Sequence, residues 1–197
     1  SRGRRCKCAV PCTVHPCALH PGHPAPWAPC ALHPAPCALH PAPSRAPPAG
    51  GGEAAARAPV LFSIHGGGYV AGSSAMDDSS MDELCPKLGI VVVSVEYRLA
   101  PEHPYPAAID DCEAALRWTI VNAADLGIDA DRIGITGVSA GGGLCAALGL
   151  RARDGGIPVR FQLLDCPMID DTMTTASSQL EGLAIWSKAS NDFGWSA

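Results

Sequence analysis

Hydrophobic residues from about residue 57 onward gather in short runs that are separated by turn residues. Four of these runs are rich in β-branched and large aliphatic side chains: APVLFSIH, GIVVVSVEY, RIGITGVS and VRFQLLD. Short apolar runs of this composition are typical of buried strands. The pattern therefore predicts strands at residues 60–65, 90–96, 132–138 and 160–165.

The stretches between these runs carry apolar residues at helical spacing, which predicts helices at residues 76–88, 110–122 and 140–153. Asp110 and Asp111 fall where a first helical turn favours negative charge, and Arg151 and Arg153 fall where a last turn favours positive charge. Strands that alternate with helices form a parallel sheet, joined by right-handed crossovers. The predicted fold class is α/β, with a mostly parallel sheet and helices on both faces.

The first fifty or so residues follow a different pattern. They hold six of the ten cysteines and five of the seven histidines, and the unit PCALHPAP occurs at 29–36 and again at 36–43. Proline at this density excludes a helix and removes strand donors, and the spacing leaves no periodic apolar face. We expect residues 1–52 to be a low-complexity, disordered tail. A metal-binding tract is the alternative, but the paired ligand spacing of a zinc finger is missing, so no metal site is predicted.

Charge and hydropathy exclude some classes of binding partner and location. The formal net charge is −5 and no basic stripe is present, which argues against nucleic acid. No apolar run approaches the roughly 18 residues that a membrane span needs. Prolines interrupt the start, where a signal peptide would need an apolar stretch, so a cytoplasmic setting is expected.

Later cysteines in apolar contexts are expected to be reduced core residues: Cys85, Cys112, Cys145 and Cys166.

The segment Gly137-Val138-Ser139-Ala140-Gly141 matches the pattern GxSxG between a predicted strand and a predicted helix. Small residues at such a turn leave the serine hydroxyl clear of the backbone, and the free N–H groups of the helix favour negative charge there. Ser139 is therefore a candidate nucleophile. The pattern alone also fits a glycine-rich turn that happens to contain a serine.

A second glycine motif, His65-Gly66-Gly67-Gly68, follows the first predicted strand. Glycines let backbone N–H groups approach an oxyanion without a Cβ in the way, and acyl transfer passes through such an oxyanion. Gly67 and Gly68, together with the N–H group of Ala140, are candidate donors of an oxyanion hole.

Four segments together resemble the bacterial hormone-sensitive-lipase family of α/β-hydrolase serine esterases: HGGGYVAGS, VEYRLAPEHPYPAAIDD, GVSAGGGLCAAL and LLDCPMIDD. WSKASNDFGW resembles the part of that family that precedes the return of the cap to the core. The resemblance covers residues 57–197. It implies an α/β-hydrolase catalytic domain that hydrolyses small-molecule carboxylic esters of short to medium acyl chains, without metal or cofactor. It also implies that Ser139 is the nucleophile and that Arg98 and Glu102 are structural.

The chain departs from the family after the serine. The catalytic acid and base of this fold follow the nucleophile, but no histidine follows Ser139, and His65 and His103 belong to other motifs. Asp170 and Asp171 are expected to form a turn. We therefore expect a chain that stops before the last strands, lacks the triad acid and base, and is nearly inactive.

Other interpretations stay open. They are an inactive hydrolase relic, an amidase or peptidase of the same fold, and a metal-binding module with a hydrolase remnant. No particular oligomeric state is predicted.

Overall fold

The computed structural model describes residues 5–6, 12–13, 38–40, 57–182 and 184–197. The expectations for the Pro/Cys/His-rich tract fall mostly outside these ranges. The exceptions are three short strands: β1 (Arg5–Cys6) and β2 (Cys12–Thr13), which pair antiparallel, and β3 (Ala38–His40). β3 pairs antiparallel with an edge of the main sheet, although prolines flank it in the sequence.

The main sheet contains the four strands that the apolar runs predict. They are β4 (Ala58–Ile64), β5 (Val91–Val95), β6 (Ile128–Val138) and β7 (Phe161–Asp165). The sheet order is β3-β5-β4-β6-β7, and the four longer strands are all parallel. The mostly parallel α/β architecture is confirmed. β6 begins earlier than predicted, because Ile128 pairs with Ala58 before an irregularity in the register.

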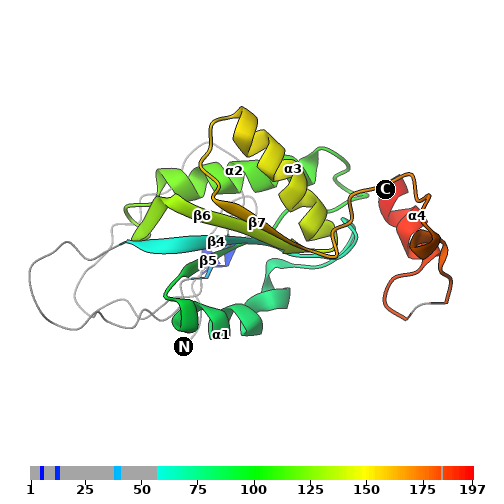
Figure 1. Cartoon of the computed structure of the whole chain (residues 1–197), viewed down its shortest axis with the longest axis horizontal. Helices are drawn as coiled ribbons and strands as arrows, with labels where there is room; N and C mark the ends of the chain where they lie inside the picture. Colours follow the sequence, from blue (N-terminus) through cyan, green and yellow to red (C-terminus); the bar gives the residue numbers. More distant parts are fainter. Residues whose placement is uncertain (1–4, 7–11, 14–37, 41–56, 183) are drawn as a thin grey trace, which may run out of the picture.

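Helices cover both faces of this sheet, as expected (Figure 1). α2 (Ala107–Val121) and α3 (Ala140–Asp154) lie on one face, and α1 (Asp78–Leu88), which follows the 3-10 helix η1 (Ser74–Asp77), lies on the other. Two further elements follow β7: the 3-10 helix η2 (Ala176–Gln179) and α4 (Lys188–Ser196). α4 stands off one end of the sheet (Figure 1).

Between β4 and β6 the direction of the connections reverses. β4 continues through α1 to β5 on one side, whereas β6 continues through α3 to β7 on the other side. In open parallel sheets, ligands bind outside the carboxyl ends of the strands at such a switch point. β4 ends at the HGGG motif and β6 ends at Ser139, so both motifs flank this point.

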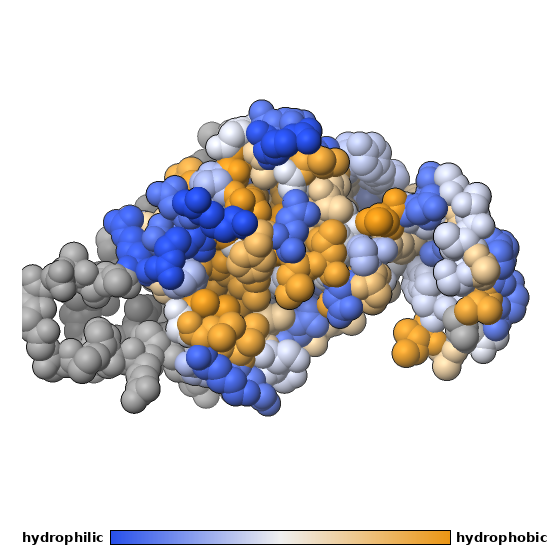
Figure 2. Space-filling view, in the orientation of Figure 1, coloured by the Kyte–Doolittle hydropathy of each residue, from blue (hydrophilic) through white to orange (hydrophobic). Residues whose placement is uncertain are grey.

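The core lies along the two central strands, where Phe62, Ile64, Ile133 and Ile135 are inaccessible to solvent. β7, by contrast, forms an edge of the sheet. Its Phe161 and Leu163 are 54% and 59% exposed, and apolar residues gather over the middle of the face seen in Figure 2. Burial therefore decreases from the switch point toward β7.

The prediction for the later cysteines is confirmed at three positions and wrong at one. Cys85, Cys112 and Cys145 are buried in the core, and burial raises the pKa of the Cys145 thiol to about 12. Cys166 is free but exposed. It follows the edge strand β7 in a turn where its φ is 36°, so no element covers it.

Candidate active site

Ser139 forms the turn between β6 and α3 and has the left-handed backbone angles φ 56° and ψ −117°. Such a conformation costs a non-glycine residue about 1–3 kcal/mol unless its surroundings hold it. Three backbone hydrogen bonds do so here. The Ser139 N–H group donates to the Asp165 carbonyl (2.9 Å), and the Ser139 carbonyl accepts from Gly143 (3.1 Å) and Met168 (2.8 Å). The predicted strand-to-helix turn is thus present, and the role of Ser139 as a nucleophile stays a prediction.

Glycines around Ser139 let α3 and β4 approach more closely than any side chain would allow. A methyl group at Gly141 would lie 2.0 Å from the Ile64 carbonyl oxygen and 2.5 Å from that of His65. A methyl group at Gly137 would lie 2.4 Å from the Gly141 carbonyl oxygen. Real Cβ atoms do not approach backbone oxygens at such distances, so these two positions require glycine.

The HGGG turn lies at the same end of the sheet as Ser139, as its expected function requires. A methyl group at Gly66 would lie 3.5 Å from the Ser139 Cβ and 2.9 Å from the Val138 carbonyl oxygen. Gly67 and Gly68 have φ of 118° and 63°, and the Gly67 carbonyl accepts the N–H groups of Val70 (3.1 Å) and Ala71 (3.0 Å). The turn is thereby folded back beside Ser139. The role of Gly67, Gly68 and Ala140 as oxyanion donors stays a prediction.

His65 is a buried structural residue of this turn. Its Nδ1 lies 2.8 Å from the Gly66 carbonyl oxygen, and its ring stacks on Tyr97 with 4.2 Å between centroids. The Tyr97 hydroxyl donates to the His65 carbonyl (3.0 Å). Burial lowers the pKa of His65, against the smaller raising effects of the Gly66 carbonyl and of Glu96 and Asp77. A neutral imidazole packed in this way supports the turn and is not available as a catalytic base.

Tyr69, which sequence analysis did not single out, joins the glycine turn to the loop after β7. Its hydroxyl donates to the Met168 carbonyl at 2.6 Å, and its ring packs against Trp195 with 5.4 Å between centroids. Burial raises the pKa of Tyr69 to about 12. Gly143 makes room for this contact, since a methyl group there would lie 2.2 Å from the Tyr69 hydroxyl. The one sequence feature that could have indicated a role for Tyr69 is its position directly after the HGGG motif.

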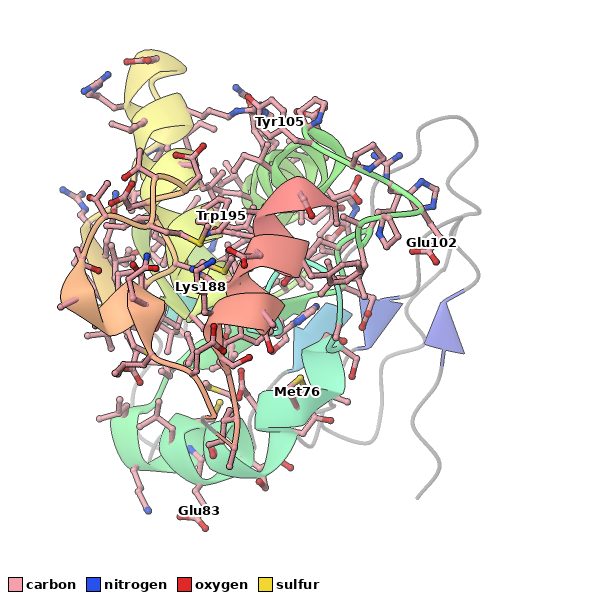
Figure 3. The ribbon with its side chains drawn as sticks, turned by 90° about the vertical axis from the view of Figure 1, so that its right-hand side faces the viewer. Met76, Glu83, Glu102, Tyr105, Lys188 and Trp195 are labelled. Atoms are coloured by element: carbon pink, nitrogen blue, oxygen red, sulfur yellow. The ribbon has the colours of Figure 1, made fainter. Side chains whose placement is uncertain are left out.

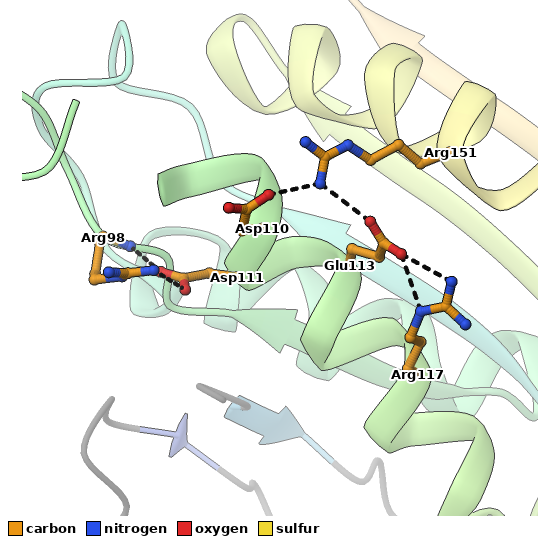
Figure 4. Close-up of polar contacts among 6 residues, drawn as sticks. All are labelled: Arg98, Asp110, Asp111, Glu113, Arg117 and Arg151. Carbon is orange, nitrogen blue, oxygen red and sulfur yellow. Dashed lines mark hydrogen bonds and ion pairs between the residues drawn. The ribbon is translucent and has the colours of Figure 1, made fainter. Parts of the chain in front are cut away.

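An ion-pair network supports the loop that leads from β5 to α2 (Figure 4). Arg98 donates from Nε and Nη2 to the two carboxylate oxygens of Asp111, each at 2.8 Å, and its backbone N–H group adds a third bond at 2.9 Å. On the outer side of α2, Arg151 reaches Asp110 at 2.7 Å and Glu113 at 3.1 Å. These acidic residues tie α2 to the loop and to α3. Asp110 lies in the first turn of α2, as predicted, whereas Asp111 follows that turn and is buried.

The other residues that the sequence singled out are either exposed or part of a turn, and none of them is placed to act on Ser139. Glu102 and His103 are exposed, and Glu102 lies well away from α4 in Figure 3. Asp170 accepts hydrogen bonds from the N–H group and the hydroxyl of Thr172, at 3.0 Å and 2.6 Å, which confirms the predicted turn. Asp192 pairs with Lys188 at 2.7 Å.

A cavity of about 270 Å³ opens at Ser139. The loop after β7, η2 and α4 form its walls, and α4 lies in front of the sheet with Lys188 and Trp195 on it (Figure 3). The lining combines apolar and polar side chains: Met168, Leu180, Trp186, Trp195, Ser177, Ser178, Lys188 and Asn191. The volume lies just below the roughly 300–1,000 Å³ of pockets for drug-sized ligands, so the cavity suits a small molecule.

Among the described residues, no group of three or more His, Cys, Asp or Glu side chains is placed to hold a metal ion. In the same part of the chain, no helix is long and apolar enough to cross a membrane.

Residues 61–197 match the alpha/beta hydrolase fold family. The chain belongs to this family. Esterase LipI of Mycobacterium tuberculosis is 49% identical over 113 residues, which are 57% of this chain and 35% of that esterase. Human hormone-sensitive lipase is 39% identical over 100 residues, which are 51% of this chain and 9% of that lipase. The resemblance to the hormone-sensitive-lipase family is thereby confirmed.

Solved structures agree with this assignment. The bacterial heroin esterase superposes with a TM-score of 0.69 at 43% identity, covering 72% of this α/β-hydrolase chain and 45% of the esterase. The chain thus spans about a third of the length of LipI and less than half of the solved esterase.

Proposed function

We propose that this α/β-hydrolase segment carries the nucleophile and the oxyanion hole of a carboxylic-ester hydrolase that acts on small esters of short to medium acyl chain. The observation that carries the proposal is the position of Ser139. It occupies a left-handed strand-to-helix turn at the switch point, beside the HGGG turn, and opens into a cavity.

In the proposed reaction, the Ser139 hydroxyl oxygen attacks the ester carbonyl carbon, and the carbonyl π electrons move onto oxygen. The backbone N–H groups of Gly67, Gly68 and Ala140 would bind that oxyanion, and the positive end of α3 would stabilise it further. Donors fixed by the glycine packing around the turn need no rearrangement during the reaction. Collapse of the intermediate expels the alcohol and leaves an acyl ester on Ser139, which water then hydrolyses.

The serine proton must pass to a base, and we assign this role to residues beyond Ala197. Of the two histidines between residues 57 and 182, His65 is buried against Tyr97 and His103 is exposed in the loop before α2. The order of the triad in this fold is serine, acid, histidine, so both missing groups belong after the nucleophile. The match to only 35% of LipI leaves room for them. The 197-residue segment alone should be nearly inactive, because loss of a triad member costs up to about 10⁶ in rate.

The test uses the full-length protein that contains this segment. Ser139→Ala should lower kcat for p-nitrophenyl butyrate by about 10⁴–10⁶ and abolish labelling by a fluorophosphonate. Ser80→Ala is the matched control, since Ser80 is exposed on α1, outside the lining of the cavity, and its loss should leave kcat within about twofold. A folded full-length protein that neither hydrolyses esters nor is labelled at Ser139 would instead be an inactive relic. Turnover of an anilide in preference to the ester would favour an amidase.

A further inference from the structure

The cavity at Ser139 is bounded on the side of the glycine turn by the ring of Trp186. A methyl group on Gly68 would lie 1.8 Å from Cη2 of the indole, so the benzene edge of Trp186 rests directly on the Gly68 backbone. Gly194 of α4 approaches the same ring, since a methyl group there would lie 3.3 Å from Cζ2. Two glycines far apart in the sequence thus leave space for one aromatic ring.

A hydrogen bond fixes the other edge of the ring. The Trp186 Nε1–H group donates to Oδ1 of Asn191 at 3.1 Å, and Asn191 lines the cavity from α4. α4 itself is held at its start, where the Ser187 hydroxyl accepts from the Ser190 N–H group (3.3 Å). The indole therefore spans from the glycine turn to the first half of α4.

We propose that Trp186 sets the upper size limit of the ester group that reaches Ser139, and that Asn191 is the positioning residue that holds the ring over Gly68. This inference rests on the proposed function. A group that extends from a carbonyl bound beside Ser139 toward Gly68 meets the indole ring of Trp186 instead of open space. In a cavity of about 270 Å³, a ring of this size occupies space that several methylene groups would otherwise fill.

The substrate class that follows is an ester whose group on this side is short. Removing the ring should extend the accepted chain, because one methylene that fits or fails to fit an apolar pocket changes the specificity by about 10–200-fold. Removing only the hydrogen-bond acceptor at Asn191 should release the ring of Trp186 without deleting it. The preference should then also move toward longer chains, but by a smaller factor.

The experiment measures second-order rates of Ser139 labelling in the full-length protein with alkyl fluorophosphonates from ethyl to octyl. Labelling forms an Oγ–P bond and releases fluoride, and the serine proton passes to the catalytic base. Trp186→Ala should raise the octyl-to-ethyl rate ratio by about tenfold or more, and Asn191→Leu should raise it in the same direction. Asn191→Asp keeps an acceptor and should retain the wild-type ratio. Phe193→Ala, an exposed position on the same helix, is the control and should leave the ratio unchanged.

The outcomes separate the inference from the proposed function. Wild-type labelling at Ser139 with an unchanged ratio in both Trp186→Ala and Trp186→Phe would overturn the role of Trp186 and leave the esterase proposal intact. An altered ratio in Asn191→Asp equal to that in Asn191→Leu would overturn the positioning role of Asn191. Absence of Ser139 labelling by every chain length in wild type would overturn the proposed function and this inference together. The Phe variant keeps the test decisive if the Ala variant fails to fold.

Discussion

Two regions meet at the cavity, and they are held in different ways. The serine cradle, residues 64–72 and 137–143, consists largely of backbone packed on backbone, and glycines occupy the positions where a methyl group would collide with carbonyl oxygens. The C-terminal segment, residues 166–182 and 184–197, is mostly half-buried or exposed and is held by side chains such as Tyr69, Trp186 and Asn191. The cradle has no room for added side-chain atoms at its glycines, whereas contacts between side chains hold the C-terminal segment in place.

This difference separates the proposed chemistry from the proposed specificity. Backbone donors and a strained serine need fixed geometry, which backbone packing provides. A wall made of side chains can change with single substitutions while the sheet below it stays the same. We therefore expect substitutions in the cradle to affect folding and those in the C-terminal segment to affect mainly which ligand is accepted.

The largest effect should come from adding one carbon to the cradle. Gly141→Ala places a methyl group against two carbonyl oxygens, one in β4 and one in the HGGG turn, which cannot move independently. The free energy of unfolding should therefore fall by about 3 kcal/mol or more. Gly149→Ala on the same helix is the matched control. Its methyl group meets only the flexible end of Gln162, and alanine favours a helix over glycine by about 1 kcal/mol. Urea denaturation of the full-length variants measures both. Equal stability of the two variants would contradict the proposed rigidity of the cradle.

A smaller loss is expected at the ion pair that supports the loop before α2. Asp111→Ala removes a buried carboxylate that accepts three hydrogen bonds from Arg98, whose own side chain is 41% exposed and can still be hydrated. The expected loss is about 2–3 kcal/mol of unfolding free energy. Lys87→Ala breaks a pair with Glu83 that is 67% and 77% exposed, and should change the stability by at most about 0.5 kcal/mol. Thermal denaturation of both variants measures these losses. A comparable loss of stability in Asp111→Ala and Lys87→Ala would contradict the greater contribution of the buried pair.

The link between the two regions should be weaker still. Tyr69→Phe deletes the hydroxyl that donates to the Met168 carbonyl and leaves the ring against Trp195, at a cost of about 1 kcal/mol. Hydrogen exchange should show that the loss is local, with faster exchange in residues 166–170 than in β4 or β6. Uniform acceleration across the sheet would mean that the C-terminal segment is part of the same cooperative unit.

The most gradual effect should be a dependence of stability on pH that arises in the cradle. Burial lowers the pKa of His65 below its ordinary value of 6.5, so below that pH the unfolded chain binds a proton that folded His65 does not. Stability from this group is therefore complete above about pH 6.5 and is lost as the pH falls toward the lowered value. His65→Gln should flatten the slope of the melting temperature between pH 7 and 5, because it removes the imidazole whose pKa burial lowers. An unchanged slope in His65→Gln would exclude His65 as its source.

The cradle could be predicted from the sequence because its constraints are local. A strand that ends in Gly-Val-Ser-Ala-Gly has few conformations that leave the serine accessible, and the HGGG turn follows its strand directly. The strands were recognisable since the core residues of β4 and β5 form apolar runs that only one serine interrupts in each, Ser63 and Ser94. The start of β6 was missed, because IDADR carries three charges and its pairing with Ala58 depends on a neighbouring strand.

The wall of the cavity could not be predicted in the same way. Trp186 lies in a stretch with no helical or strand period, and its contacts with Gly68 and Gly194 arise only when distant segments meet. α4 consists of KASNDFGWS, in which Ser, Asn, Asp and Gly are poor helix formers, so its sequence gives little sign of a helix. Tyr69 likewise acquires its partner, the Met168 carbonyl, from beyond β7.

The register of β4 against β6 also has a kinetic consequence. Ile64 pairs with Gly137, so the glycine turn and Ser139 come together only after the intervening α1, β5 and α2 have been looped out. Non-local parallel pairing of this kind is slow, because the entropy of loop closure is lost before the contacts form. Reactivity at Ser139 should accordingly appear late in refolding, after helical circular dichroism has recovered. Labelling of Ser139 during refolding would then report when the central sheet is complete.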